Sequence, residues 1–469
     1  MNRKLLLLLS VLLLGGCMRK VPYQQPASPV PPAWPHNEPS RPEGDSAPKA
    51  AELPWQTFFT DDGLRKVIET ALANNRDLRM AALHIERAQA LYRIQRAQQF
   101  PTVNATASGS LYRLPKNSSI GGFDVSQAVT VQQYTVNLGA SSWEVDLFGR
   151  IRNLKSAALE QYLATEQART ATQMALVANV ASSYLALAAD RKSLQLAQAT
   201  FDAQQSTYEL IRQTRDAGVA TDLDLQQAQS QVESARVDIA RYTGQVTLDE
   251  NALDLLVGSP VASTLQAPEL SSAGAVKDIA TQLPSEVLLR RPDILAAEHQ
   301  LRAAYANIGA ARAAYFPRIA LTAGTGLMSS DLSKLFNSTA GTWNFAPQVA
   351  IPLFDYGTRK ANVKVAEVDR DLAVAEYEKA IQAAFREVSD SLSQRTRLME
   401  QQQAQQALVD TLEQTYRLSE ARYKAGLDSY LSVLVAQRAL YGGQQGLVGL
   451  RLARLGNLVT LYKALGGGA

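Results

Sequence analysis

Two kinds of hydrophobic pattern alternate along this chain, one with the period of a helix and one with the period of a strand. The helical kind fills two proline-free segments of equal length, Gly149 to Gly218 and Gly357 to Gly426. A representative stretch has apolar residues at i, i+3, i+4 and i+7: Met174, Val177, Ala178 and Ala181. As a continuous helix, each segment would be roughly 100 Å long at a rise of 1.5 Å per residue. Helices of that length indicate coiled-coil or solenoid-like elements.

The strand kind occurs in four runs, of which two precede each long helical segment: 103–111, 134–147, 319–325 and 343–353. Each run has an apolar face and a small polar face, and Trp or Tyr lies near several ends, which is typical of transmembrane β-strands. Taken alone, any one of these runs would fit a half-buried strand of a soluble β-sandwich as well as it fits a transmembrane strand. In the second run the apolar side changes after Ala140, which predicts a bulge or the end of the strand.

The chain contains an internal duplication. Phe100 recurs as Phe316, an offset of 216 positions, whereas Gly218 recurs as Gly426, an offset of 208. The copies "YELIRQTRDAG" and "YRLSEARYKAG" end at these two glycines. The difference of eight positions falls in the segment "RLPKNSSIGGFDVSQ", which we interpret as an exposed loop because length changes collect in loops.

Each repeat is therefore predicted as helix, strand, loop, strand, very long helix, tight turn and helix. We predict a first repeat at 55–260, a linker at 261–284 and a second repeat at 285–469. Gly218 and Gly426 are predicted to end the long helices, because glycine accepts the left-handed conformation that turns the chain back. Four strands cannot close a barrel, and single-chain bacterial barrels start at eight. Three copies of the chain would supply twelve strands, which is enough to close a barrel.

Two dipeptides mark helix starts in the second repeat. Pro284-Ser285 and Pro292-Asp293 each combine proline, which suits the first helical turn, with a polar residue. Ser285 is predicted to act as an N-cap.

The N-terminus has the pattern of an export signal. Basic residues precede the apolar run Leu5 to Leu14, which is too short to span a bilayer, and the segment ends in "LGGC". This ending resembles a bacterial lipobox, so we predict a signal peptide at 1–16 and diacylglycerol plus a fatty acyl chain on Cys17. The alternative is an ordinary signal with a chance cysteine. Met18 at the second mature position resembles the address for the outer membrane, and 17–54 is predicted as a lipidated, proline-rich tether that acts as a spacer.

Composition and motifs argue against several classes of protein. The formal net charge of +3 gives no clustered basic face for nucleic acid. Cys17 is the sole cysteine, so no disulfide can form within the chain. No nucleophile elbow, P-loop or metal-ligand spacing occurs, and the three histidines, His36, His84 and His299, lie far apart in the sequence. We therefore predict no enzyme activity and no metal, and we find no fully apolar window of about 20 residues after the signal that would form a transmembrane helix.

Several long stretches resemble one family, the outer membrane factors of tripartite efflux pumps, which are the TolC-like proteins, and most closely their OprM-like lipoprotein branch. The matching stretches are "WQTFFTDDGLRKVIETALANNRDLR" (55–79), "WEVDLFGRIRN" (143–153), "LPSEVLLRRPDILAAE" (283–298), "NIGAARAAYFPRIALT" (307–322), "ARYKAGLDSYLSVLVAQR" (421–438) and "LYKALGGG" (461–468). The resemblance implies a mainly α protein with membrane β: duplicated long helical hairpins form a periplasmic α-barrel, and four strands per chain contribute to a trimeric 12-stranded transmembrane β-barrel.

The resemblance also implies function and partners. It implies an outer-membrane channel for drug or solute efflux that extends into the periplasm and opens by an iris-like movement of its tip. The implied partners are two further copies of the chain, a periplasmic adaptor, an inner-membrane pump of the RND type and outer-membrane lipid. An alternative from the residues alone is a lipid-anchored periplasmic coiled-coil scaffold without a pore, but it would not explain four symmetrically placed strand runs.

Candidate gate residues follow from the same resemblance. Arg422 and Tyr423 match the family's "RY" before the second turn, and Leu431 matches the position of an apolar ring. Val435 stands where the family motif "LLDAQR" has an acidic residue. Three aspartates close to the turns could take its place: Asp222, Asp224 and Asp428. The alternative is that these charges only solvate exposed turns.

The lipobox interpretation predicts the effect of replacing its cysteine. Cys17→Ser should abolish incorporation of radiolabelled fatty acid and slow removal of the signal, whereas the barrel should still insert through its apolar band. Metabolic labelling of cells that express each form measures this, and label in the serine variant would show the interpretation to be wrong.

Overall fold

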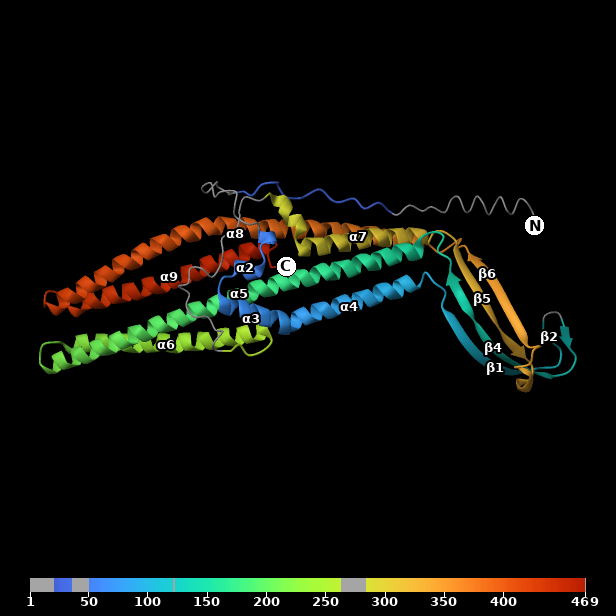
Figure 1. Ribbon diagram of the computed structural model, residues 1–469, viewed down its shortest axis with the longest axis horizontal. Helices are drawn as coiled ribbons and strands as arrows, with labels where there is room; N and C mark the ends of the chain where they lie inside the picture. The colour runs from blue at the N-terminus through green and yellow to red at the C-terminus, as the bar shows by residue number, and fades with distance from the viewer. Residues whose placement is uncertain (1–20, 36–49, 121–122, 263–283, 469) are drawn as a thin grey trace. The chain divides into compact units, whose positions relative to one another are not determined.

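The computed structural model describes residues 21–35, 50–120, 123–262 and 284–468 (Figure 1). The predicted signal peptide 1–16, the predicted lipidation site Cys17 and most of the predicted linker 261–284 lie outside these residues. Contacts divide the chain into two compact units. Of the described residues, unit 1 comprises 21–26, 85–120, 123–164 and 297–376, and unit 2 comprises 27–35, 50–84, 165–262, 284–296 and 377–468.

Helices make up most of the described chain. The α-helices are α2 Trp55–Phe58, α3 Asp62–Asn74, α4 Arg76–Ala97, α5 Arg150–Asp216, α6 Asp222–Val257, α7 Pro292–Ala313, α8 Thr358–Lys424 and α9 Tyr430–Ala464. Short 3-10 helices are η1 Ala50–Glu52, η3 Ser285–Arg290 and η4 Leu332–Lys334. The two long helices, α5 and α8, have 67 residues each and confirm the prediction from the proline-free segments.

The predicted strand runs form one antiparallel sheet in unit 1 with the order β1-β4-β5-β6. Its strands are β1 Val103–Leu114, β4 Val129–Glu144, β5 Arg318–Ser329 and β6 Gly341–Ala350. The fourth run was predicted too long, because β6 ends at Ala350. The segment predicted as a loop also contains a short hairpin of β2 Ser118–Ile120 and β3 Phe123–Val125.

A β-bulge explains the change of apolar side in the second run. Ala140 pairs with Ala323, but the next pair joins Trp143 to Leu321, so β4 has one extra residue. Ser142 in the bulge has a φ of 54°, and its amide donates to the hydroxyl of Thr322 at 3.0 Å. A bulge, rather than the end of the strand, is therefore the correct interpretation.

The outer strands of this sheet are exposed on both faces. Nearly every residue of β1 and β6 is exposed, including large apolar residues such as Leu111, Trp343 and Phe345. A strand of a soluble sandwich would bury alternate residues against a second sheet. The sandwich interpretation is therefore wrong for these two strands.

An aromatic cluster in unit 2 joins the start of the first repeat to the end of the second. Phe58 of α2 stacks on Tyr462 of α9, with ring centroids 3.9 Å apart, and both side chains are fully buried. The Tyr462 hydroxyl donates to the carbonyl oxygen of Leu53 at 2.6 Å. These contacts tie the C-terminal helix to the last residues of the predicted tether and to the start of the first repeat.

The described part of the predicted tether packs against the body. Trp34 is buried and stacks on Phe385 with ring centroids 4.8 Å apart. The Ser285 hydroxyl donates to the carbonyl oxygen of Pro31 at 2.8 Å. The Ser285 amide donates to the carbonyl oxygen of Pro32 at 3.1 Å. Residues 27–35 are therefore not a free spacer. The prediction that Ser285 caps a helix is also wrong, because Ser285 is the first residue of η3 and its side chain bonds the tether.

A buried arginine links three segments of unit 2. The Arg291 guanidinium donates to both carboxylate oxygens of Asp293 at 3.0 and 2.7 Å, and to Glu387 of α8 at 3.0 Å. It also donates to the carbonyl oxygen of Ala464 at the end of α9 at 2.9 Å. Removing one member of such a network leaves the other charges without compensation.

One helix of the described chain, α5, is long and apolar enough to cross a bilayer by length and composition. In the most apolar 18-residue window of α5, 56% of the window is buried within the protein. Core helices of soluble proteins pass the same test, so the window is weak support for a membrane helix.

The Arg291 network predicts a stability defect. Arg291→Ala should lower the free energy of unfolding by about 3 kcal/mol, because Asp293 and Glu387 lose their cation and a helix-end carbonyl loses its donor. Guanidinium unfolding followed by circular dichroism measures the change. Its neighbour Arg290 is exposed, so Arg290→Ala should behave like the parent, and equal effects of the two substitutions would contradict the prediction.

Candidate functional site

The two helical hairpins of unit 2 turn at the predicted glycines. Gly218 follows α5 with a φ of 79°, and Gly426 follows α8 with a φ of 72°. After each of them, the next residue donates its amide back to a late helix carbonyl: Val219 to Thr214 at 2.9 Å and Leu427 to Arg422 at 3.0 Å. These are the helix ends that glycine favours, and they confirm the predicted turns.

Different interactions stabilise the first turn and the second. In the first, Thr221 and Asp224 form a capping box at the start of α6, with the Thr221 amide 3.0 Å from the Asp224 carboxylate. In the second, Arg422 donates two hydrogen bonds to Asp428, at 2.6 and 3.1 Å, across the turn. The hydrogen bond from Arg422 lowers the pKa of Asp428, so this carboxylate stays ionised. Arg422 is thus engaged within its own turn rather than with Asp224.

The tips of the two repeats meet in an apolar cluster. Its buried members come from both repeats: Ile211, Leu225, Ala228, Tyr430, Val433 and Leu434. Partly buried side chains pack against it: Tyr208, Ala220, Tyr416 and Tyr423. The cluster holds the two hairpins of one chain together at the turns.

Tyr423 is the candidate gate residue that links this cluster to a charge on the other repeat. Its ring centroid lies 5.7 Å from that of Tyr430. Burial, and then the negative charge of Asp224, raise the pKa of Tyr423, and burial raises the pKa of Tyr430 to about 12. Both hydroxyls therefore remain protonated at neutral pH. The charge of Asp224, in the first repeat, therefore acts on a side chain of the second repeat.

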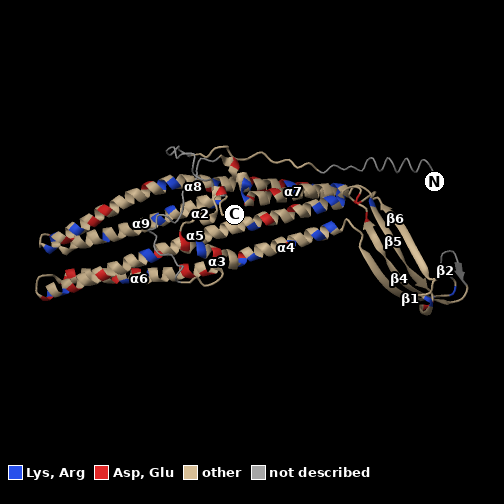
Figure 2. Cartoon of the chain, viewed as in Figure 1, with Lys and Arg blue, Asp and Glu red and all other residues tan. Residues whose placement is uncertain are grey.

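The remaining candidates lie at the surface of the hairpins. Leu431 and Val435 are exposed side chains of α9, and neither is covered by the chain's own helices. Asp222 is exposed and lies 3.6 Å from Arg215. Figure 2 shows acidic and basic residues together at both turns. Of the three aspartates, Asp224 caps a helix and Asp428 pairs with Arg422, so Asp222 has the least engaged carboxylate.

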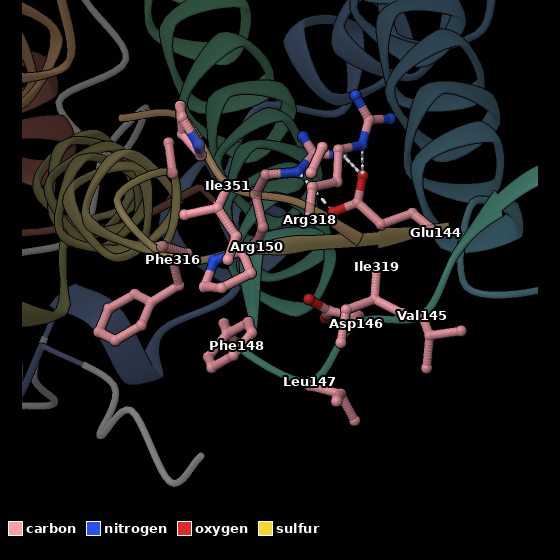
Figure 3. A pocket seen from close by; sticks show the side chains of 15 residues that line it. Glu144, Val145, Asp146, Leu147, Phe148, Arg150, Phe316, Arg318, Ile319 and Ile351 are labelled. Atoms are coloured by element: carbon pink, nitrogen blue, oxygen red, sulfur yellow. Dashed lines mark hydrogen bonds and ion pairs between the residues drawn. The ribbon is translucent and has the colours of Figure 1, made fainter. Parts of the chain in front are cut away.

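A second cluster, which was not predicted from the sequence, lies where strands meet helices in unit 1 (Figure 3). Glu144 at the end of β4 accepts two hydrogen bonds from Arg150 of α5, at 2.8 and 2.9 Å, and lies 2.6 Å from Arg318 of β5. Next to it is a cavity of about 430 Å³ with mostly apolar walls that include Phe148 and Phe316. The available sequence signal was a carboxylate that directly follows Trp143 at the end of an apolar run.

Within the described residues there is no group of three or more His, Cys, Asp or Glu side chains that could hold a metal ion. His299 lies with its Nδ1 atom 2.7 Å from a carboxylate oxygen of Glu160, and this contact links α7 to α5. His36 lies outside the described residues. The absence of enzyme activity stays a prediction.

Comparison with known proteins identifies the family. The model of the outer membrane efflux protein family matches residues 67–259 and 283–467. The chain belongs to this family. It is 46% identical over 469 residues to the antibiotic efflux pump outer membrane protein ArpC of Pseudomonas putida and to the toluene efflux pump outer membrane protein TtgC of the same species. Each match covers all of this chain and 96% of the relative.

A solved structure extends this result. The open state of the outer membrane channel MtrE of Neisseria gonorrhoeae has a TM-score of 0.86 and 36% identity, and the match covers 96% of this chain and 98% of MtrE. The predicted fold class is confirmed: a mainly helical chain contributes four strands to a trimeric channel. This outer membrane efflux protein is located in the outer membrane and is the channel component of an efflux pump, so the channel is favoured over the scaffold. The repeat boundaries stay a prediction.

A pair of carboxyl groups in unit 2 predicts a pH dependence. Burial, and then a hydrogen bond and charge repulsion from Asp249 of α6, raise the pKa of Asp190 of α5 to about 6. A raised carboxyl pKa means that the folded state holds the proton more tightly than the unfolded state. Stability should therefore fall as the pH rises from about 4 to about 6 and stay lower above that range.

Replacing Asp190 tests this dependence. Asp190→Asn should stabilise the protein by about 1 kcal/mol at pH 7.5, since solvent screens the half-buried pair, and should have little effect at pH 4. Thermal unfolding at the two pH values measures the difference. An equal change in stability at both pH values would show that the carboxyl pair does not titrate in this range.

Proposed function

We propose that three copies of this chain form a passive, water-filled duct from the periplasm to the exterior, with a gate at the helix turns. The observation that carries the proposal is the sheet of unit 1, whose two edge strands, β1 and β6, have no partner within the described chain. Unpaired backbone groups are not tolerated in hydrocarbon. Pairing the β6 edge of one copy with the β1 edge of the next, three times, gives a closed barrel of twelve strands.

The energy for transport must come from other proteins. The described residues contain no group of acidic, His or Cys side chains that could hold a metal ion, the sequence has no P-loop motif, and the channel is a component of a pump. We propose that the duct connects to a periplasmic adaptor and an inner-membrane pump of the RND type. The named substrates of the relatives, antibiotics and toluene, support small organic compounds as the transported class.

A lipid on Cys17 would add a second attachment to the outer membrane. The signal ending "LGGC" supports diacylglycerol and a fatty acyl chain on this residue. Several acyl chains on one residue anchor a protein stably, in contrast to a single chain. The packed residues 27–35 would then fix the path of the chain between the anchor and unit 2.

The gate is proposed to depend on the second turn. Arg422 and Asp428 hold this turn in shape, and Tyr423 packs on the tip cluster near Asp224 of the other repeat. The exposed Leu431 would form an apolar ring when three copies are brought together, and Asp222, Asp224 or Asp428 would supply acidic groups in place of Val435. Opening would require the second hairpin to move away from the first, which breaks the Tyr423 contacts.

The gate predicts a change in conductance. Replacing Arg422 and Tyr423 together with Ala should raise single-channel conductance in planar bilayers severalfold, because the turn loses its ion pair and the cluster loses a ring. Cells with this variant should also become sensitive to vancomycin, which is too large for the closed tip. Lys424→Ala is the matched control, since Lys424 lies on the same tip but pairs within α8 with Glu420.

Three outcomes separate the possibilities. Unchanged conductance in a normally expressed double variant would mean that these residues only solvate the turn. Absence of any conductance in both the parent and the double variant would favour the scaffold. A monomer that conducts would contradict the trimeric barrel.

A further inference from the structure

Helix α9 is rich in glycine, which helices usually avoid. The long helices α5 and α8 contain none, and α6, the equivalent of α9 in the first repeat, contains only Gly244. Residues 442–449 of α9, here called the glycine segment, contain four: Gly442, Gly443, Gly446 and Gly449. Each glycine inside a helix makes it less stable than alanine would, because glycine loses more backbone freedom on folding.

Close packing within the chain explains only two of these glycines. A Cβ atom on Gly443 would lie 3.0 Å from a side-chain carbon of α8, and one on Gly446 would lie 2.9 Å from Gln405 of α8. A Cβ atom on Gly442 or Gly449 would meet nothing within 4 Å in the described chain beyond its own helix turn. Alanine would therefore fit at Gly442 and Gly449, and lack of space does not explain why glycine is present.

The equivalent segment of the first repeat has no glycine. The offset of 208 positions maps the four glycines to residues of α6 that all carry side chains: Ser234, Ala235, Asp238 and Arg241. At a rise of 1.5 Å per residue, Gly442 lies about 18 Å from the start of α9 at Tyr430. The two hairpins therefore differ in backbone freedom at the same distance from their turns.

A side chain of α8 hydrogen-bonds to the backbone inside the glycine segment. The Nε2 atom of Gln405 donates to the carbonyl oxygen of Gly443 at 2.8 Å. In an α-helix the same oxygen accepts from the amide four residues later, so the two donors share it. Helices bend at glycine pairs and where a side chain inserts into the hydrogen-bond ladder, and both features occur at Gly442-Gly443.

A polar cavity of about 230 Å³ lies between this part of α9 and the first repeat. Its walls include Tyr441 and Gly442 of α9 and Gln204 of α5. Gln204 is 3% exposed, and its Oε1 atom has no hydrogen-bond partner within the described chain. Ordered water fills polar cavities and pairs with such groups. Water in place of close-packed side chains gives α9 room to move at this level.

α9 is held on both sides of the glycine segment. Toward the turn, it contributes to the tip cluster. Toward the C-terminus, Asn457 is buried and donates to a carbonyl oxygen of α8 at 3.1 Å, and Tyr462 stacks on Phe58. Within the segment, Leu447 and Val448 are buried and keep α9 beside its neighbours. The segment is thus a weakened stretch of backbone between two anchored ends.

We propose that the glycine segment is the bending point of α9 about which the tip of the second hairpin moves when the gate opens. The inference rests on the proposed gate and names residues that supply its movement. In the structure, where the tips of the two hairpins touch, α9 is continuous from Tyr430 to Ala464, so the bend belongs to the open state. α8 would follow by the gentle curvature that long helices adopt.

Stiffening the segment tests the proposal in a protein whose gate is already released. Adding Gly442→Ala and Gly449→Ala to the Arg422→Ala, Tyr423→Ala protein should lower its single-channel open probability about fivefold or more, because alanine favours the continuous helix. Neither alanine clashes within the chain. Gly244→Ala is the matched control, since a Cβ atom there also meets nothing within 4 Å but lies in α6.

Hydrogen exchange gives an independent measurement of the bending point. In the parent protein, amides 443–450 of α9 should exchange about tenfold faster than amides 235–242 of α6, because a weakened helix opens locally more often. The alanine pair at Gly442 and Gly449 should remove most of this difference. Equal exchange of the two segments in the parent would overturn the inference.

The outcomes separate this inference from the proposed function. If the Arg422→Ala, Tyr423→Ala protein conducts and the alanine pair leaves its open probability unchanged or raises it, the bending point is wrong and the channel proposal survives. If the alanine pair prevents trimer assembly and Gly244→Ala does not, the glycines serve the close approach of another copy, and the bending point is again wrong. If neither the parent nor the gate variant conducts, both proposals fail.

Discussion

The hydrogen-bonding requirement of the sheet edges is the constraint on which the rest of the structure depends. β1 and β6 end a sheet of four strands, and their outer backbone groups have no partner in the described chain. In a bilayer such groups must be paired, so the strands are useful only when other copies close the ring.

Both repeats contribute two strands to the sheet and one long helix. Within unit 1, α7 of the second repeat approaches α5 of the first closely at Gly309 and Asn153. At the hairpin tips in unit 2, the two repeats differ more. A capping box stabilises the first turn and the Arg422–Asp428 pair stabilises the second. The two turns are therefore held by different local interactions even though the repeats share their overall plan.

Much of the candidate site was predictable because its signals are local. The glycines at 218 and 426 mark turns through a backbone conformation, and Asp222, Asp224 and Asp428 lie close to these turns in the sequence. The pairing of Arg422 with Asp428 was not predicted, although the two residues are close in sequence. Neither was the cluster around Glu144, because its partner Arg318 lies in the other repeat and only the β4–β5 pairing brings them together.

The sequence by itself determined the two periodicities, the lengths of α5 and α8, the duplication and the parity change near Ala140. These properties depend on the backbone and on neighbouring residues, so a pattern of apolar positions is sufficient to specify them. Tertiary structure decided which faces are covered. Trp34 packs on Phe385 and the tether is not free, because burial depends on residues hundreds of positions apart. The same physical reason leaves Leu372 exposed where its equivalent Ala164 is buried: only the fold places a partner beside one and not the other.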